Sequence, residues 1–122
     1  MTKKHLSFGQ ALREKRIAKK FSLRKFAELV GISPTYLSQV EQSNVDPPTA
    51  ERVQRMAELL EENPDELIAL AGRVADDLPA IIQAKTEVPD LLRAVRGLSA
   101  EQLRRLRESA EEMKREKSKK DR

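Results

Sequence analysis

The side chains best suited to reading another molecule lie on one face of the segment Ser33–Gln42. This face is polar but uncharged, and its members are Pro34, Thr35, Ser38 and Gln39. A side-chain amide can pair with both N6 and N7 of adenine, and hydroxyl groups can reach several base edges or a thymine methyl group. A face that only kept the protein in solution would more often carry Glu and Lys. We therefore expect these four residues to contact DNA bases.

The residues around this face are suited to holding the phosphate backbone of DNA. Positive side chains, an amide and the free N–H groups at a helix start can all contact phosphate oxygens. The members of this set are Ser22, Arg24, Lys25, Tyr36, Asn44 and Thr49. Tyr36 also borders an apolar stripe, and packing there is as compatible with the sequence as donation of its hydroxyl group to a phosphate. Asp46 would repel phosphate, which counts against contacts from the surrounding loop.

Arg16 and Glu41 are charged residues on otherwise apolar helix faces. Arg16 follows Leu12 by one helical turn, and Glu41 follows Leu37 in the same way. Burying one charge is costly, whereas two opposite charges that meet can be buried together. We expect a structural ion pair between these two residues. A phosphate contact from Arg16 is the alternative.

No set of residues suggests catalysis or a metal site. The chain has no Cys and a single His, His5. The acidic residues between Glu58 and Glu66 have the spacing of a solvated helix face. Nothing supplies a nucleophile with its base, a Gly-rich phosphate loop or a set of metal ligands. We therefore expect neither enzyme activity nor a cofactor or metal.

Composition places the chain among small helical proteins. Of its 122 residues, 39% are hydrophobic, 36% are charged and 3% are aromatic, and Gly and Pro are few. Residues 1–30 carry a net charge of +7 and residues 31–72 a net charge of −6, so the N-terminal part is the one compatible with phosphate binding. No apolar run approaches the roughly 18 residues of a membrane span. The expectation is a cytoplasmic protein that does not contact a membrane.

Helix-start signals divide the first 72 residues into short helices. A Ser, Thr or Asn side chain can cap a helix by accepting a hydrogen bond from a free N–H group of its first turn. The first of these helices is predicted to run to about Lys19. The last is predicted to end at Gly72, with Leu67, Leu70 and Ala71 facing inward. Five capped helices, forming one compact unit over residues 7–72, are predicted by Ser7, Ser22, Ser33, Thr49 and Asn63.

Within this unit, the segment Leu23–Gln42 has the pattern of two helices joined by a sharp turn. Its sequence is LRKFAELVGISPTYLSQVEQ. Ala27 supplies the small side chain needed where two such helices cross, and Gly31 suits the turn. The segment resembles the helix-turn-helix of the Cro and phage-repressor (XRE-type) family of transcription regulators, and the likeness extends from Phe8 to Gly72.

The resemblance carries several expectations. It covers Pro47-Pro48-Thr49 and the ending LIALAG at residues 67–72. It implies a five-helix repressor-like fold, DNA binding through the helix Ser33–Gln42, and the same Arg16–Glu41 ion pair. The loop 42–46 departs from the common pattern, because many family members have Gly and Lys where this chain has QSNVD. This departure again argues against phosphate contacts from that loop.

Residues 73–116 are expected to form a helical segment that makes a homodimer. Short helices are predicted near Leu78 and from Pro89, and a longer one after a capping box at Ser99–Gln102. Their apolar residues need a partner surface, either in a second copy or, as the alternative, in the core of the same chain. The predicted interface consists of Leu78, Ile81, Ile82, Leu91, Leu92, Val95, Leu98, Leu103 and Leu106. Residues 117–122 are predicted to be a disordered basic tail.

Together these features predict an all-α protein, with a five-helix DNA-binding domain followed by a helical dimerisation segment. The predicted function is sequence-specific transcriptional regulation by a dimeric repressor that reads a palindromic double-stranded operator. The alternative is an antitoxin-type interaction protein whose C-terminal helices bind a small protein partner, a toxin, and which also regulates its own operon.

Overall fold

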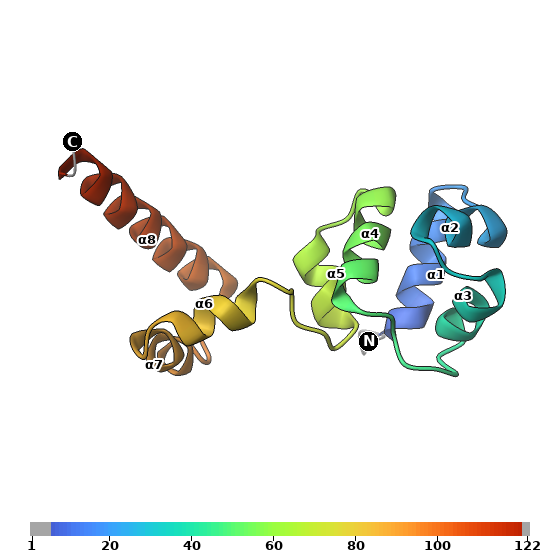
Figure 1. Cartoon of the computed structure of the whole chain (residues 1–122), viewed down its shortest axis with the longest axis horizontal. Helices are drawn as coiled ribbons and strands as arrows, with labels where there is room; N and C mark the ends of the chain where they lie inside the picture. Colours follow the sequence, from blue (N-terminus) through green and yellow to red (C-terminus); the bar gives the residue numbers. More distant parts are fainter. Residues whose placement is uncertain (1–5, 121–122) are drawn as a thin grey trace. The chain divides into compact units, whose positions relative to one another are not determined.

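The computed structural model describes residues 6–120, and every regular element within them is an α-helix. The chain divides into two compact units, Met1–Leu78 and Pro79–Arg122 (Figure 1). The helices are α1 (Phe8–Ala18), α2 (Leu23–Val30), α3 (Pro34–Glu41), α4 (Ala50–Leu60), α5 (Pro64–Leu70), α6 (Leu78–Ala84), α7 (Glu87–Ala94) and α8 (Ala100–Lys120). The all-α class expected from the sequence is confirmed.

Each of the first five helices begins at the predicted cap. In every case the side-chain oxygen of the cap accepts a hydrogen bond from the backbone N–H three residues later. At α1 the cap is reciprocal, since the Gln10 side chain also accepts from the Ser7 N–H at 3.1 Å. Helix α1 ends at Ala18, one residue before its predicted end. The other four helices start at the predicted residues.

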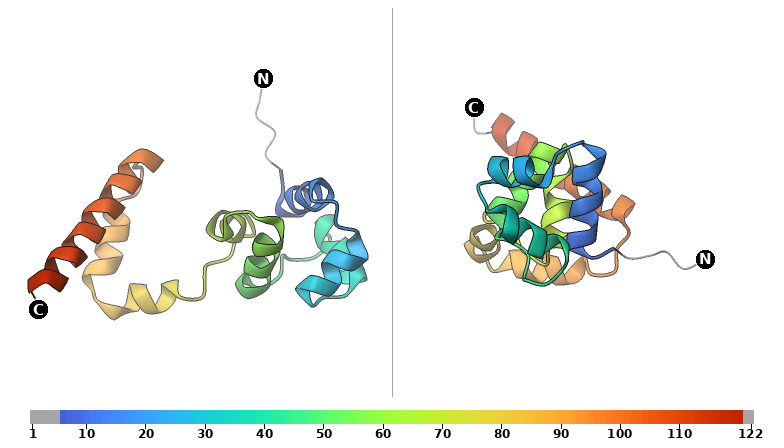
Figure 2. Two further views of the ribbon diagram at one scale, coloured as in Figure 1. Left: turned by 90° about the horizontal axis from the view of Figure 1, so that it is seen from above. Right: turned by 90° about the vertical axis from the view of Figure 1, so that its right-hand side faces the viewer.

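Helices α1–α5 of the N-terminal unit pack together (Figure 2), and their buried side chains form one hydrophobic core. Helix α4 packs on α5, α2 packs on α3 and α4, and α1 packs on α3. Leu70 was expected to face inward, but 44% of its surface is exposed, and Ile68 is buried instead. The side chains at 67, 68 and 71 share one helical face, and position 70 lies outside it. The largest fully buried side chains are Phe26, Leu12, Leu37, Met56, Leu60, Val40 and Val53.

The turn between α2 and α3 depends on Gly31. Its φ is +88°, in the left-handed region that glycine enters without steric cost. The N–H groups of Gly31 and Ile32 both donate to the Ala27 carbonyl, at 2.9 and 3.0 Å, which closes the end of α2. Ala27 itself is completely buried, as expected for a small residue at a helix crossing. The turn fixes the direction in which α3 leaves α2.

Helices α1 and α3 meet at Gly9, a contact that the sequence did not predict. A Cβ atom at Gly9 would lie 2.3 Å from the Val40 carbonyl oxygen and 2.8 Å from that of Glu41. Real Cβ atoms do not approach oxygen so closely, so only glycine fits while α1 rests against the end of α3. The close approach brings Arg16 of α1 and Glu41 of α3 within reach of each other.

The compact N-terminal unit continues past Gly72, the predicted end of the DNA-binding domain. Arg73 donates hydrogen bonds from Nε to the Pro48 carbonyl at 3.1 Å and from Nη2 to the Pro47 carbonyl. Ala75 packs against the core from the same connecting segment. Gly72 does end the last turn of α5, with φ at +71°, but the chain that follows is held to the same unit up to Leu78.

The helices of the C-terminal unit enclose no core within the described residues. None of residues 79–119 is classed as buried, and all the closely packed helix pairs lie among α1–α5. Helix α7 starts at Glu87, two residues before the predicted start, because Pro89 fits the first turn, where N–H groups lack helical partners anyway. Before α8, Ser99 and Gln102 form the predicted reciprocal cap, at 2.9 and 3.1 Å.

The predicted disordered tail is wrong as far as Lys120. Helix α8 continues through Lys117–Lys120. Lysine is a good helix former, and positive side chains near a helix C-terminus interact favourably with its dipole. Residues 121 and 122 of the predicted tail lie outside the described residues. Among the helices described between residues 6 and 120, none combines the length and apolar character that crossing a membrane requires.

Candidate nucleic-acid interface

Helix α3 presents its polar face because its opposite face is locked into the core. Ser33 caps the helix and Pro34 occupies its first position, where a missing N–H does no harm. Leu37 and Val40 are buried with 0% and 2% of their surface exposed. The four predicted base-contacting residues therefore share the outer side of one helix. Pro34 and Thr35 are exposed, and Ser38 and Gln39 are half-buried.

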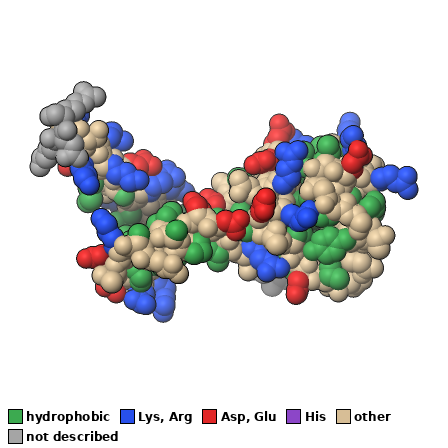
Figure 3. Space-filling model, viewed as in Figure 1, with side chains coloured by type: hydrophobic (Ala, Val, Ile, Leu, Met, Phe, Trp, Pro, Cys, Tyr) green, Lys and Arg blue, Asp and Glu red, His purple; other side chains and the backbone are tan. Residues whose placement is uncertain are grey.

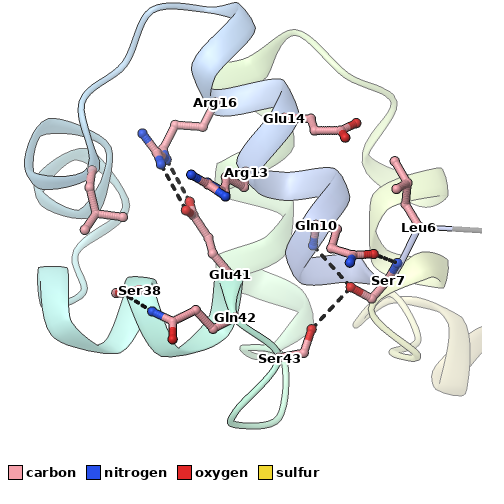
Figure 4. A pocket seen from close by; sticks show the side chains of 11 residues that line it. Leu6, Ser7, Gln10, Arg13, Glu14, Arg16, Ser38, Glu41, Gln42 and Ser43 are labelled. Carbon is pink, nitrogen blue, oxygen red and sulfur yellow. Dashed lines mark hydrogen bonds and ion pairs between the residues drawn. The ribbon is translucent and has the colours of Figure 1, made fainter.

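A chain of amide hydrogen bonds runs along the end of this face. Gln42 donates from Nε2 to the Ser38 hydroxyl at 2.8 Å, as Figure 4 shows. Asn44 donates from Nδ2 to Oε1 of Gln39 at 3.0 Å and to Oε1 of Gln42 at 3.4 Å. The Asn44 backbone N–H donates to the Gln39 carbonyl at 3.0 Å. Asn44, predicted as a phosphate contact, is thus bonded to Gln39 on the polar face of α3 and to Gln42 at the end of the helix.

Arg16 and Glu41 form the predicted ion pair. Arg16 donates from Nε to Oε2 of Glu41 at 2.7 Å and from Nη2 to Oε1 at 2.9 Å (Figure 4). The remaining nitrogen, Nη1, donates to the Phe21 carbonyl at 2.9 Å. Only 10% of the Arg16 side chain and 5% of the Glu41 side chain are exposed. A bidentate pair with these partners is structural, and its charge is neutralised within the protein.

A groove of about 910 Å³ lies between α1 and α3 beside this ion pair. Ser38 and Gln42 form part of its α3 wall, and Gln10 and Arg13 form part of its α1 wall (Figure 4). Sequence reasoning missed Arg13, although the helical period was the available signal, since Arg13 lies one turn before Arg16. The groove adds an exposed positive side chain to the edge of the polar face.

Acidic residues neutralise part of the basic N-terminal segment. Lys15 pairs with Glu62 at 3.0 Å, and Lys19 pairs with Glu61. The hydrogen bond from Lys19, together with its positive charge, lowers the pKa of the Glu61 carboxyl group. Figure 3 accordingly shows acidic and basic side chains interspersed over this unit. Between residues 6 and 30, the basic residues without an ion-pair partner among the described residues are Arg13, Lys20, Arg24 and Lys25.

Three of the predicted phosphate contacts lie at the start of α2. Ser22 accepts the Lys25 N–H at 3.0 Å, which leaves its hydroxyl hydrogen free to donate. Arg24 and Lys25 are both exposed in the first turn of α2. These three residues therefore combine positive charge with hydrogen-bond donors at one helix start.

The other two predicted phosphate contacts share a second groove. Tyr36 and Thr49 line a hollow of about 410 Å³ between the turn of α2–α3 and the start of α4. Tyr36 is half-buried: it packs against the core and also lines the hollow, a position compatible with both roles left open by the sequence. Arg52, which the sequence analysis did not single out, also lines the hollow, and its Nη1 donates to the Gly31 carbonyl at 2.8 Å. Arg52 thus ties the helix-turn-helix turn to α4.

A family model described as helix-turn-helix matches residues 12–67, which span α1 through the middle of α5. These residues make up just under half of the chain, and over them it is similar to the Cro and phage-repressor (XRE) family of DNA-binding regulators. The resemblance expected from the sequence is confirmed. Within the helix-turn-helix domain, α2 and α3 are the paired helices and α3 is the second, which enters the major groove in domains of this type.

Solved structures of similar chains include three named regulators. SinR, a master regulator of biofilm formation solved in complex with DNA, is 26% identical with a TM-score of 0.46, over 50% of this chain and 97% of that one. The P22 c2 repressor, solved with a synthetic operator, is 27% identical with a TM-score of 0.47, over 52% and 94%. The clp gene regulator ClgR from Corynebacterium glutamicum is 28% identical with a TM-score of 0.47, over 73% and 86%. The likeness to the family rests on the match over residues 12–67 and not on these solved structures. No curated protein sequence matches the chain.

The described residues hold no cluster of three or more His, Cys, Asp and Glu side chains suited to a metal ion. His5, which the sequence analysis set aside as a ligand, lies outside the described residues. Every buried side-chain nitrogen and oxygen in the described part of the chain has a hydrogen-bond partner. The polar groups that remain for a ligand are therefore at the surface of the described residues.

Proposed function

We propose that this protein is a dimeric repressor that recognises a palindromic double-stranded DNA operator through α3. The observation that carries the proposal is the uncharged polar face of α3, held outward by buried Leu37 and Val40 on a helix-turn-helix scaffold. Hydroxyl and amide groups on such a face match the donors and acceptors of base edges in the major groove. A binding role of this kind requires no catalytic group, so the proposed function is not that of an enzyme.

In the proposed complex, α3 lies in the major groove and the residues around it fix its position. The start of α2, with Ser22, Arg24 and Lys25, contacts one stretch of the phosphate backbone. Tyr36 and Thr49 contact another through the hollow that they share. The bases are read by Pro34, Thr35, Ser38 and Gln39. Phosphate contacts of this kind set the register of the protein on the duplex, and base contacts supply the sequence preference.

The proposed dimer forms through the C-terminal unit. The predicted interface residues have no buried position within the chain, and several are largely exposed, including Leu91 at 57%, Ile81 at 50% and Leu92 at 47%. Apolar side chains gain free energy when another surface removes them from water. A second copy would supply the cover and place two α3 helices on half-sites ~34 Å apart.

Selection of bound duplexes from random DNA sequences tests the proposed function. We expect one enriched motif with two inverted half-sites. Gln39→Ala should weaken binding to that motif by about 1–3 kcal/mol, whereas Gln54→Ala, the same substitution on an exposed position of α4, should not. Binding that shows no sequence preference would contradict the proposal. The antitoxin alternative is not favoured by the comparisons, and a small protein that consistently co-purifies at equal stoichiometry would reopen it.

A further inference from the structure

The amide chain at the end of α3 decides which hydrogen-bonding groups the recognition face offers. We propose that Asn44 is a positioning residue that turns Gln39 and Ser38 into hydrogen-bond donors toward DNA, so that they select bases with acceptors, above all guanine. This inference deepens the proposed function and rests on it. The observations that carry it are the bonds Asn44–Gln39, Asn44–Gln42 and Gln42–Ser38.

Asn44 has no donor left for a phosphate. An asparagine side chain has two N–H hydrogens, and here Nδ2 donates to two glutamine oxygens. The third donor, the backbone N–H, is bonded to the Gln39 carbonyl. What remains is Oδ1, an acceptor that cannot hydrogen-bond to a phosphate oxygen. Asn44 therefore fits a positioning role better than the phosphate contact predicted from the sequence.

Gln39 is oriented by its bond to Asn44. Its Oε1 lies 3.0 Å from Nδ2 of Asn44, and because the two polar atoms of an amide diverge from one carbon, Nε2 points away from Asn44. Nε2 donates no hydrogen bond within the described residues, so both of its hydrogens are available to an outside partner. Guanine offers two acceptors in the major groove, O6 and N7, whereas cytosine offers only a donor.

Ser38 is oriented by the same chain. Its hydroxyl oxygen accepts from Nε2 of Gln42, whose own oxygen accepts from Asn44. Because the Ser38 oxygen already holds an incoming hydrogen, its O–H is directed to an outside acceptor. Ser38 and Gln39 thus act together as donors on adjacent positions of α3.

DNA binding makes this orientation matter. Hydrogen bonds between exposed side chains add little to stability in water, because water replaces them readily. In the protein–DNA interface water is displaced, and an amide oxygen without a donor becomes costly. Asn44 supplies that donor from within the protein, so the Gln39 amide can enter the interface in one orientation without loss.

The test compares the base preference of the native chain and of two Asn44 variants at the operator position whose preference Gln39→Ala abolishes. For the native chain we expect guanine to bind about tenfold more tightly than cytosine there. Asn44→Ala should lower this ratio to near one. Asn44→Asp offers only acceptors, so the Gln39 amide must turn its Nε2 inward, and the preference should shift toward the donors of cytosine or adenine. Ratios within each variant cancel the uniform effect of the added negative charge.

Two controls keep the outcomes distinct. The salt dependence of binding for Asn44→Ala should match that of the native chain, because no phosphate contact is removed. An unchanged guanine-to-cytosine ratio in both variants, or a uniform loss of affinity with a shallower salt dependence, would overturn the inference. A native preference for adenine or cytosine at this position would overturn it as well. None of these results affects the proposed function, which fails only if the native chain shows no sequence preference at all.

Discussion

The guanidinium group of Arg16 donates hydrogen bonds to two partners, the Glu41 carboxylate and the Phe21 carbonyl. Removing either member of the ion pair leaves a buried charge without its counterion. We expect Arg16→Ala and Glu41→Ala each to lower the free energy of unfolding by about 3–5 kcal/mol. Urea denaturation of each variant measures this loss.

The double substitution Arg16→Met with Glu41→Leu separates pairing from burial. Replacing both charges by apolar side chains of similar size leaves nothing unpaired, so much of the lost stability should return. Single effects that simply add in the double alanine variant would contradict a direct interaction, because residues in contact are not independent.

Lys25 and Lys19 differ in one respect that matters for DNA. Lys25 is exposed without an acidic partner among the described residues, whereas Lys19 is paired with Glu61. Lys25→Ala should weaken binding to all sequences alike and reduce the slope of log affinity against log salt by roughly one phosphate contact. Lys19→Ala, the matched control, should leave the slope unchanged. Titrations at several salt concentrations measure both, and a changed base preference in Lys25→Ala would contradict its role.

At this scale the sequence was informative wherever a residue broke its local pattern. Arg16 and Glu41 interrupt apolar stripes, and that interruption predicted the pair. The partners of Lys15 and Lys19 come from residues more than 40 positions away, on a connection whose path only the packed helices define. The amide chain at Asn44 depends on how the loop after α3 turns back, and composition carries no trace of it.

At the scale of helices, Gly9 sets the distance between α1 and α3. Alanine is the better helix former by about 1 kcal/mol, so Gly9→Ala would stabilise an isolated α1. In the folded chain its Cβ would lie 2.3 Å from the Val40 carbonyl oxygen, and the two helices must move apart. We expect a net loss of about 1–3 kcal/mol in urea denaturation. Glu14→Ala, on an exposed position of the same helix, should show no comparable loss.

The starts of the first five helices were predictable, and, apart from the Arg16–Glu41 pair, the contacts between helices were not. A cap is written in one residue and the three that follow, so five caps could be located from the sequence. A glycine inside a helix gives no periodic signal, and only the position of α3 explains Gly9. Gly72 has the typical features of a domain end, but the Arg73 side chain reaches back to Pro47 and Pro48, which lie 26 and 25 residues earlier.

At the scale of the whole chain, the position of a truncation tests this boundary. A fragment of residues 1–77 keeps Arg73 and Ala75, and a fragment of residues 1–72 loses both. We expect the shorter fragment to be less stable by about 1–3 kcal/mol, because charged hydrogen bonds to two carbonyl groups are removed. Thermal unfolding of both fragments measures the difference. Arg73→Ala in the longer fragment should reproduce part of the loss, and equal stabilities would restore the boundary at Gly72.

The same longer fragment tests the proposed dimer. Sedimentation should show a monomer for residues 1–77 and a dimer for the full chain. Linking two domains makes the second binding event effectively intramolecular, so the fragment should bind the operator roughly 10²–10⁴ times more weakly. Full chains that remain monomeric, or a fragment that dimerises and binds equally well, would contradict an interface in the C-terminal unit.

The lack of a buried residue between positions 79 and 119 has a consequence for how folding depends on protein concentration. Helices without a core of their own persist only while another surface covers them, since short helices are marginal in water. Under the proposed dimerisation, dilution would therefore melt the C-terminal half while the N-terminal half stays folded. The helical content of the protein would then vary with its concentration. The protein would leave the operator because its C-terminal half unfolds, and not by simple dissociation of a folded dimer. Operator binding would then depend steeply on the number of copies, because newly made molecules would not bind as dimers until they are numerous enough to fold together.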